Sequence, residues 1–256
     1  MAQRIAVLSD THGVLPCLDA VLGEPDVQAA DLIVVTGDLA AGPQPCEVLD
    51  RLSALGSQVL LVRGNADRDL VDAARSAGSP SLPPVDAWAA DQLDSSHVDL
   101  LAGLAHPVTV PLDGVGDVLF CHGTPRDDNE VVLVDSRPSW WAEVLRDVPE
   151  TVRIICCGHT HMPFVRLVDR RWIVNSGSVG MSYGTRGVPW VLLDERGVQL
   201  RSTPIDAEEV ARSVVARSTF PQVREWVQEY LLDPPSDLDA VRAFGPRDGR
   251  ATGWDG

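Results

Sequence analysis

The 256-residue sequence predicts an α/β fold in which two β-sheets pack face to face as a sandwich flanked by helices. Short apolar runs alternate with helix-like stretches in the first part of the chain, a pattern typical of parallel strands joined by helical crossovers. Strand-like runs separated by turn residues follow between positions 108 and 193. Apolar residues make up 45% of the chain and aromatic residues only 5%, so aliphatic side chains must fill the core.

The parallel half is expected to begin with three strands, at residues 5–8, 32–35 and 59–62. Each run is apolar without alternation, which indicates strands that are buried on both faces. Helices are expected over residues 14–22 and 46–55, and the second of these starts after prolines and ends at Gly56.

The hairpin-rich half is expected to contain six further strands. They are residues 108–112, 118–121, 154–157, 164–168, 172–175 and 190–193. Turn residues at 113–114 and 195–197 suggest hairpins between some of them. A cluster of Pro, Ser and Gly over 78–86 predicts a surface loop, and a helix is expected near 94–103. We interpret the segment 78–93 as an ordinary loop rather than a lid over a cleft.

The pattern becomes helical after residue 205, over 208–215 and 222–232. Residues 233–256 are rich in Pro, Gly, Asp and Arg, which predicts a poorly ordered tail. We therefore divide the chain into a main domain at 1–205, a helical extension at 206–232 and a tail at 233–256. The sequence leaves a homo-oligomer open, and the C-terminal helices are one candidate for its contact.

Charge excludes several functions. The chain has 37 acidic and 21 basic residues, a net charge of −16, and every basic residue is Arg. Without lysine there is no phosphate-loop lysine, no Schiff base and no lysine nucleophile. The acidic balance argues against a nucleic-acid polymer or an anionic membrane as partner, because phosphate backbones require a basic footprint.

Other features point to the cytoplasm. No apolar run approaches the roughly 18 residues of a membrane span, and an apolar strand starts too early for a signal peptide to precede it. The five cysteines form no CxxC pair and are typical of reduced core thiols.

Chemistry-bearing side chains gather just after the predicted strands. These seven predicted ligands are Asp10, His12, Asp38, Asn65, His122, His159 and His161. Ligands of open α/β folds bind in the crevice beyond the carboxyl ends of the strands. Each segment also has a glycine beside the polar group, which permits a sharp turn or a close approach. One Asp-x-His motif alone would more often be a helix cap or a core histidine, but five such motifs in one context predict a metal centre.

Oxygen and nitrogen donors without cysteine favour Mn²⁺, Fe, Zn²⁺ or Ni²⁺. Seven ligands suggest two divalent ions, since one site needs about four and a carboxylate can bridge two ions roughly 3.5–4 Å apart. Two dications against two carboxylates would leave the centre near +2, which attracts a small phosphate ester.

The order of motifs Asp-x-His, Gly-Asp, Gly-Asn-x-Asp, His-Gly and Gly-His-x-His resembles the calcineurin-like metallophosphoesterase superfamily, most closely its small bacterial and archaeal phosphodiesterases. The resemblance implies a four-layer αββα fold. It also implies that one ion, most simply Mn²⁺, is held by Asp10, His12, Asp38 and His161. Asp38 would bridge to a second ion, whose other ligands would be Asn65, His122 and His159. The implied reaction is attack of a metal-bridging hydroxide on a phosphodiester or pyrophosphate-type bond, with Asp38, Asn65 and His122 acting through that hydroxide.

One position departs from the family pattern. Many members have a histidine after the Asn that assists the transition state or the leaving group, but this chain has Ala66. Asp67 is expected to brace the loop, through Arg63 or Arg68. The small phosphodiesterases often carry a small residue there, which is compatible with activity.

Arg126 and Thr124, just after His122, are candidates for substrate binding. The alternative for Arg126 is a surface pair with Asp127 or Asp128, and the alternative for Thr124 is to shape the turn before Pro125. Residues 175–178 resemble a segment that lies near the site in relatives, although a plain turn fits them equally well. A phosphomonoesterase or protein phosphatase, or a catalytically weak metal-binding scaffold like the retromer subunit of this superfamily, remain alternatives to a phosphodiesterase.

Overall fold

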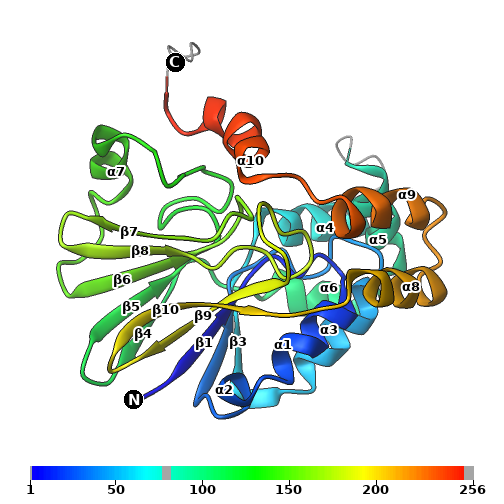
Figure 1. Cartoon of the computed structure of the whole chain (residues 1–256), viewed down its shortest axis with the longest axis horizontal. Helices are drawn as coiled ribbons and strands as arrows, with labels where there is room; N and C mark the ends of the chain where they lie inside the picture. The colour runs from blue at the N-terminus through cyan, green and yellow to red at the C-terminus, as the bar shows by residue number, and fades with distance from the viewer. Residues whose placement is uncertain (1, 77–81, 251–256) are drawn as a thin grey trace.

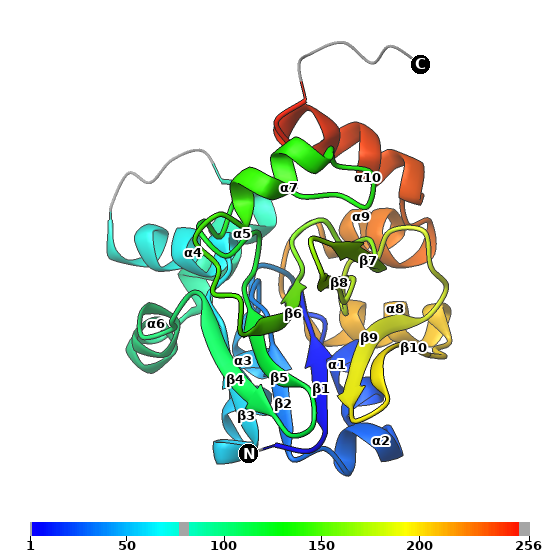
Figure 2. The same ribbon diagram turned by 90° about the vertical axis from the view of Figure 1, so that its left-hand side faces the viewer.

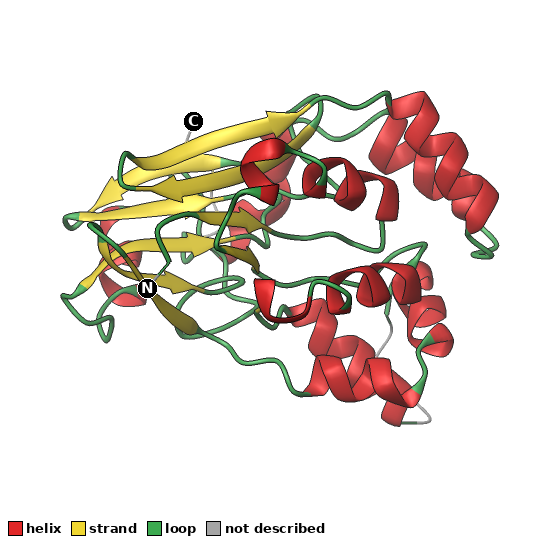
Figure 3. Ribbon diagram, turned by 90° about the horizontal axis from the view of Figure 1, so that it is seen from below, coloured by secondary structure: helices red, strands yellow, loops and turns green. Residues whose placement is uncertain are grey.

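A computed structural model describes residues 2–76 and 82–250, and it has four layers (Figure 1). Two five-stranded sheets pack face to face, and helices cover their outer sides (Figure 3). The strands are β1 (Ile5–Leu8), β2 (Leu32–Val35), β3 (Val59–Leu61), β4 (Val108–Leu112), β5 (Gly116–Phe120), β6 (Val152–Cys157), β7 (Phe164–Val168), β8 (Arg171–Asn175), β9 (Val188–Asp194) and β10 (Gly197–Thr203). This arrangement confirms the predicted sandwich.

The helices follow the strands in chain order. They are α1 (Leu15–Leu22), α2 (Pro25–Gln28), α3 (Pro45–Ser53), α4 (Asn65–Arg75), α5 (Pro84–Gln92), α6 (Ser95–Ala102), α7 (Pro138–Val144), α8 (Ala207–Arg217), α9 (Val223–Val227) and α10 (Asp237–Phe244). Short turns of helix are η1 (Gly56–Gln58), η2 (Gln228–Leu232) and η3 (Gly245–Arg247). In the part of the chain that the structure describes, no helix combines the length and the apolar character needed to cross a membrane.

The first sheet has the strand order β10-β9-β1-β2-β3. Strands β1, β2 and β3 are parallel to one another, whereas β9 runs antiparallel to β1. Alternate residues of β1 serve two cores: Ala6 and Leu8 face the helices, and Ile5 and Val7 face the other sheet. All four are fully buried, which confirms that this run is covered on both faces, whereas the residues of β3 are only half-buried.

The second sheet has the order β4-β5-β6-β8-β7, and β5, β6 and β8 are parallel. Its outer face packs against α7 and α10, in an apolar cluster that includes Ile155, Trp141 and Ala240. Figure 2 shows α7 and α10 on the same side of the sandwich. The loops that follow β1, β2, β5 and β6 meet at one end of the sandwich, and this meeting positions the site described below.

Several elements differ from the expectation. Helix α5 occupies much of the segment 78–93 that we interpreted as a loop, while residues 77–81 lie outside the described residues. Helix α4 and strand β10 were not predicted either. Strand β10 pairs with β9 along its whole length, but its residues are polar or only partly buried, so the sequence carries no run of apolar positions there.

The segment 233–256, expected to be a poorly ordered tail, contains α10 and η3. Ser236 and Asp239 form a capping box at the start of α10, with Ser236 Oγ accepting from the Asp239 N–H. Ala240 is fully buried against the second sheet. A capping box and one small buried residue give only a weak sequence signal for a helix. The Pro, Gly, Asp and Arg content of the segment therefore led to the prediction of a poorly ordered tail. Residues 251–256 lie outside the described residues.

Candidate metal centre

The seven predicted ligands occupy the ends of five strands. Asp10 and His12 follow β1, Asp38 follows β2, and Asn65 opens α4 after β3. From the second sheet, His122 follows β5, and His159 and His161 follow β6. Apart from the half-buried Asn65, all of them are at most 8% exposed. The structure brings six of them together in two clusters of three.

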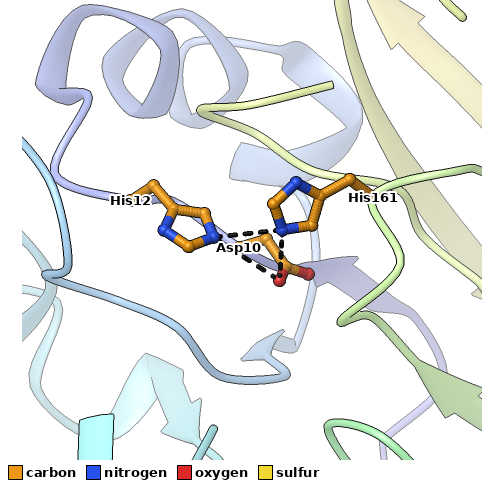
Figure 4. A group of neighbouring side chains, drawn as sticks. All are labelled: Asp10, His12 and His161. Carbon is orange, nitrogen blue, oxygen red and sulfur yellow. Dashed lines mark hydrogen bonds and ion pairs between the residues drawn. The ribbon is translucent and has the colours of Figure 1, made fainter. Parts of the chain in front are cut away.

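Cluster 1 consists of Asp10, His12 and His161, whose ligand atoms lie within 4.8 Å of one another. The three side chains converge on a single point in Figure 4. The Oδ1 atom of Asp10 is 3.1 Å from His161 Nε2 and 3.8 Å from His12 Nε2. Two ring nitrogens and a carboxylate oxygen that face one another at this spacing form a ligand set for a divalent metal ion.

Cluster 2 consists of Asp38, His122 and His159, with the same spacing of ligand atoms. The Oδ2 atom of Asp38 lies 3.1 Å from His122 Nε2. The rings of His122 and His159 meet edge to face, with their centroids 5.1 Å apart. This set again presents one carboxylate and two imidazoles.

The two clusters are neighbours. Asp38 Oδ2 of cluster 2 is 3.8 Å from His12 Nε2 of cluster 1, and Asp10 Oδ1 of cluster 1 is 3.9 Å from His122 Nε2 of cluster 2. Each carboxylate therefore reaches both clusters. This is the arrangement needed for a carboxylate shared between two ions.

The donor atoms fit metal ions because the ring tautomers direct Nε2 lone pairs inward and because three of the buried ligand atoms have no hydrogen-bond partner among the described residues. The Nδ1–H of His12 donates to the carbonyl of Ala41 (2.9 Å), and the Nδ1–H of His122 donates to that of Thr36 (2.7 Å). These bonds leave the Nε2 lone pair of each ring for a metal ion. Among the described residues, the buried atoms Asp10 Oδ1, Asn65 Oδ1 and His122 Nε2 have no hydrogen-bond partner. Buried acceptors without partners are costly, and a bound cation satisfies them.

The pKa shifts point the same way. Burial by itself would lower the pKa of His122, but the carboxylates of Asp38 and Asp10 outweigh burial and raise that pKa to about 10. Burial acts to raise the pKa of Asp38, yet it lies below its ordinary value because of the charge of His122. Burial, and then the charge of His122, lower the pKa of His159 to about 3. The centre thus attracts positive charge but does not accept a proton on each imidazole.

The backbone is left-handed at five of the seven predicted ligands. The φ angles are 53° at Asp10, 43° at His12, 51° at Asp38, 66° at His159 and 56° at His161. Non-glycine residues rarely adopt this region, and such strain persists at functional sites where the surrounding fold enforces it. In the described parts of the chain, only the 169–170 turn shares this conformation outside glycine.

Glycines permit close packing of these loops, as the sequence predicts. A Cβ atom at Gly64 would overlap the carboxylate of Asp38. A Cβ atom at Gly158 would overlap the side chains of Ser9 and Asp10. Either addition would push a ligand carboxylate out of its place.

Asp67 braces the loop that carries Asp38. Its Oδ2 atom accepts the N–H groups of Asp38 (3.0 Å) and Gly64 (2.8 Å), and its Oδ1 atom accepts the N–H of Leu39 (2.8 Å). Asp67 is fully buried. Burial and the nearby charge of Asp38 raise its pKa to about 7. Asp67 therefore braces the loop as expected, but its partners are backbone N–H groups and not arginine side chains.

The arginines expected to help Asp67 bind another carboxylate instead. The Nε of Arg63 is 3.0 Å from Asp128 Oδ2, and Arg68 also pairs with Asp128. Asp128 is 3% exposed. Its two ion pairs hold the loop after His122 against the start of α4. The expectation that Arg63 or Arg68 joins Asp67 is therefore corrected.

The two predicted substrate contacts are engaged elsewhere. Arg126 donates from Nε to Glu130 Oε2 (2.8 Å) and from Nη2 to Glu130 Oε1 (2.6 Å), and it also pairs with Glu143 (3.3 Å). The hydroxyl of Thr124 donates to Glu130 Oε2 (2.7 Å). Arg126 is thus paired with glutamates rather than with Asp127 or Asp128. Substrate binding by Arg126 and Thr124 stays a prediction, and for Arg126 it requires these ion pairs to open.

Residues 175–178 support the ligands from behind. The Nδ2 of Asn175 donates to the carbonyl of Gly158 (2.6 Å), and the hydroxyl of Ser178 donates to the carbonyl of Asp10 (2.8 Å). These bonds fix the two loops that carry cluster 1. The sequence alone did not separate this role from that of a plain turn.

A four-layer sandwich with two adjoining His/Asp clusters at its strand ends is the arrangement of a metallophosphoesterase. Residues 3–196 match the calcineurin-like phosphoesterase superfamily domain, and the chain belongs to this superfamily. The resemblance seen in the sequence motifs and the expected fold are both confirmed.

The chain is similar to relatives over most of its length and most of theirs. The chain is 24% identical to an uncharacterized protein of Methanocaldococcus jannaschii, over 90% of this chain and 98% of that protein. A metallophosphoesterase from Sphaerobacter thermophilus aligns with a TM-score of 0.69 at 22% identity, covering 90% of this chain and 98% of its own. A hypothetical protein from Pyrococcus horikoshii aligns with a TM-score of 0.73 at 20% identity, covering 88% and 97% respectively. The two solved structures therefore share the fold over most of this chain.

Proposed function

We propose that this chain is a dinuclear metal-dependent phosphoesterase that hydrolyses phosphodiester or pyrophosphate-type bonds of a small substrate. The observation that carries this proposal is the pair of adjoining clusters, in which Asp10 and Asp38 each approach histidines of both. Family membership supplies the reaction class.

In this proposal Asp10, His12, Asp38 and His161 hold one ion, and Asp38, Asn65, His122 and His159 hold the other. Asn65 is included because its buried Oδ1 has no partner among the described residues and because its neighbour Ala66 donates its N–H to Asp38 Oδ1 (2.8 Å). Imidazole, carboxylate and amide donors without sulfur suit Mn²⁺, Fe, Zn²⁺ or Ni²⁺, and we take Mn²⁺ as the native metal because the family resemblance implies it.

When bound, the two ions would supply a water of lowered pKa and positive charge for the phosphoryl oxygens. The protein's own contribution is positioning. Thr36 and Ala41 fix the tautomers of His122 and His12, and Asp67 fixes the loop of Asp38. The position next to Asn65 carries Ala66, whose methyl group can neither donate nor accept a proton. Departure of the leaving group then depends on its own stability, which favours aryl esters and pyrophosphate-type bonds over alkyl esters.

The test is an assay of purified protein reconstituted with Mn²⁺, against matched aryl phosphodiesters and phosphomonoesters. We expect two ions per chain, hydrolysis that chelation abolishes and Mn²⁺ restores, and faster hydrolysis of the diester. Activity that survives complete chelation would contradict the metal mechanism. Preference for the monoester would instead favour a phosphomonoesterase, and two bound ions without hydrolysis would favour a scaffold.

A further inference from the structure

Arg247 lies at the edge of the metal centre, brought there by the C-terminal segment. Its Nη2 atom is 3.4 Å from Nε2 of His159 in cluster 2. The same nitrogen donates to the main-chain oxygen (2.8 Å) and to the Oδ1 (2.6 Å) of Asn129. Its guanidinium also stacks near the ring of Phe244, with its central carbon 5.8 Å from the ring centroid.

The residues around Arg247 hold it firmly in this place. The next residue, Asp248, is 1% exposed and accepts hydrogen bonds from Ser136 Oγ (2.7 Å) and from Arg250 Nε (2.6 Å). On the other side, the ring of Phe244 packs edge to face on that of His159, with the centroids 5.6 Å apart. The approach of Arg247 to His159 is therefore built into the docking of the whole segment.

The charge of Arg247 has no counter-ion within the described protein. All its hydrogen-bonding partners there are neutral and all are reached through Nη2, so Nε and Nη1 keep their N–H groups free of protein partners. By contrast, Arg126 uses all three nitrogens on Glu130 and Glu143. A guanidinium offers five donors in a planar fork that matches phosphate. Arg247 is exposed, so its free N–H groups face solvent beside the metal centre and are open to an anionic ligand bound there.

We propose that Arg247 binds the phosphate group of the substrate at the metal centre, so that residues 237–250 form one wall of the active site. This inference rests on the proposed function, because it requires a metal centre that binds phosphate. It assigns to Arg247 the role that the sequence suggested for Arg126. Arginine at this place adds bidentate donors to the same phosphate and thereby fixes its orientation.

The test measures the binding of inorganic phosphate to the Mn²⁺-loaded protein by calorimetry, without turnover. Arg247→Ala should raise the Kd for phosphate about 10- to 100-fold, because hydrogen bonds to a charged group typically contribute that much to affinity. Arg247→Lys should lose less, because it keeps the charge without the fork. The matched control is Arg242→Ala: Arg242 lies on α10, is exposed and pairs only with Asp239 among the described residues, so its loss should leave the Kd unchanged. Metal content and unfolding temperature are measured for every variant.

Equal Kd values for Arg247→Ala and Arg242→Ala would overturn the inference. If Arg247→Ala lowers the unfolding temperature, Arg247→Gln replaces it, because Gln retains an amide donor for Asn129 without the charge. Equal Kd values for the Gln and Lys variants would then overturn the inference. A wild-type protein that takes up two ions but no phosphate would also overturn it, whereas a wild-type protein that takes up no ions would refute the proposed function itself.

Discussion

The Nε2 atoms of His12 and His161 face each other at 3.1 Å, on the same side of Asp10. Since the Nδ1–H of His12 is committed to the carbonyl of Ala41, its Nε2 can only present a lone pair in the neutral ring. Burial, and then the charge of His161, keep the pKa of His12 below its ordinary value, so a proton is a poor occupant of this place. A divalent cation bound here would satisfy both nitrogens and the carboxylate at once.

Replacing His161 with Ala should therefore remove one ion. We expect the metal content to fall from two ions per chain toward one, and activity to fall more than about 100-fold, since even outer residues of metal sites cost 10- to 100-fold. His97→Ala is the control, because His97 lies on α6 and contacts Asp50 rather than the centre. Elemental analysis and an aryl diester assay check the prediction. Unchanged metal content in His161→Ala would contradict the assignment.

Asp67→Ala should destabilise the protein and weaken the centre together. It leaves the buried N–H groups of Asp38, Leu39 and Gly64 without their acceptor, which should lower the free energy of unfolding by about 3 kcal/mol or more. Mn²⁺ affinity should fall about 10- to 100-fold, as for other supporting residues of metal ligands. Urea unfolding and metal titration measure the two effects. The control is Asp91→Ala, which changes an exposed residue of α5 and should alter neither the stability nor the Mn²⁺ affinity. If Asp67→Ala lowers the stability but not the Mn²⁺ affinity, Asp67 does not support the metal centre.

Hydrolysis should depend steeply on the pKa of the leaving group. Ala66 supplies no acid at the position where many family members have histidine, so poor leaving groups receive no proton from it. Ala66→His should help the alkyl esters most and flatten that dependence. Because Ala66 is buried in the apolar cluster beneath the helices, Ala66→Asn serves as a control for added bulk. A flat dependence in the wild-type enzyme would show that another acid acts.

The stability of the chelated protein should decrease as the pH rises through the titration of Asp86. Burial, and then the charges of Asp38 and Asp69, raise the pKa of Asp86 from 3.8 to about 7. The folded state then binds more protons than the unfolded state between these two values. The free energy of unfolding therefore falls with rising pH in that window, by at most about 1.4 kcal/mol per pH unit.

Asp86→Asn removes this titration and should reduce the decrease, and the remainder comes from the buried Asp67, whose pKa is also raised to about 7. The exposed Asp91→Asn on the same helix should not reduce the decrease. Urea unfolding in EDTA at pH 5 and pH 7.5 measures the difference. If the wild type and Asp86→Asn lose stability equally between these two pH values, Asp86 does not titrate as described.

Much of the fold was accessible from local pattern. The strands at 5–8, 32–35, 108–112 and 164–168 match the structure residue for residue, because an uninterrupted or alternating apolar run directly reflects burial. Helices α4 and α5 were not predicted. Helix α4 begins at the predicted ligand Asn65 and α5 begins in a proline-rich segment, and both kinds of segment are typical of loops. In α4, Leu70 and Val71 on one side and acidic residues on the other carry a helical period that would have identified it.

The metal ligands were accessible for a different reason. The residue types and strand-end positions of the seven candidate ligands are properties of the sequence itself, and the six histidines and aspartates among them form the two clusters. Arg247 could not be found this way, because an arginine in a segment rich in Pro and Gly has no signature until α10 docks beside His159. The left-handed backbone at the ligands was likewise hidden, since Asp and His give no sign of φ as glycine does.

Each cluster draws its members from both sheets: Asp10 and His12 from the first sheet meet His161 from the second, and Asp38 meets His122 and His159. An ion bound in either place would cross-link the two halves of the sandwich. Folding and metal uptake are then thermodynamically linked, and the melting temperature should climb with the concentration of free Mn²⁺. The heat tolerance of this protein would depend on metal supply as well as on its apolar interior.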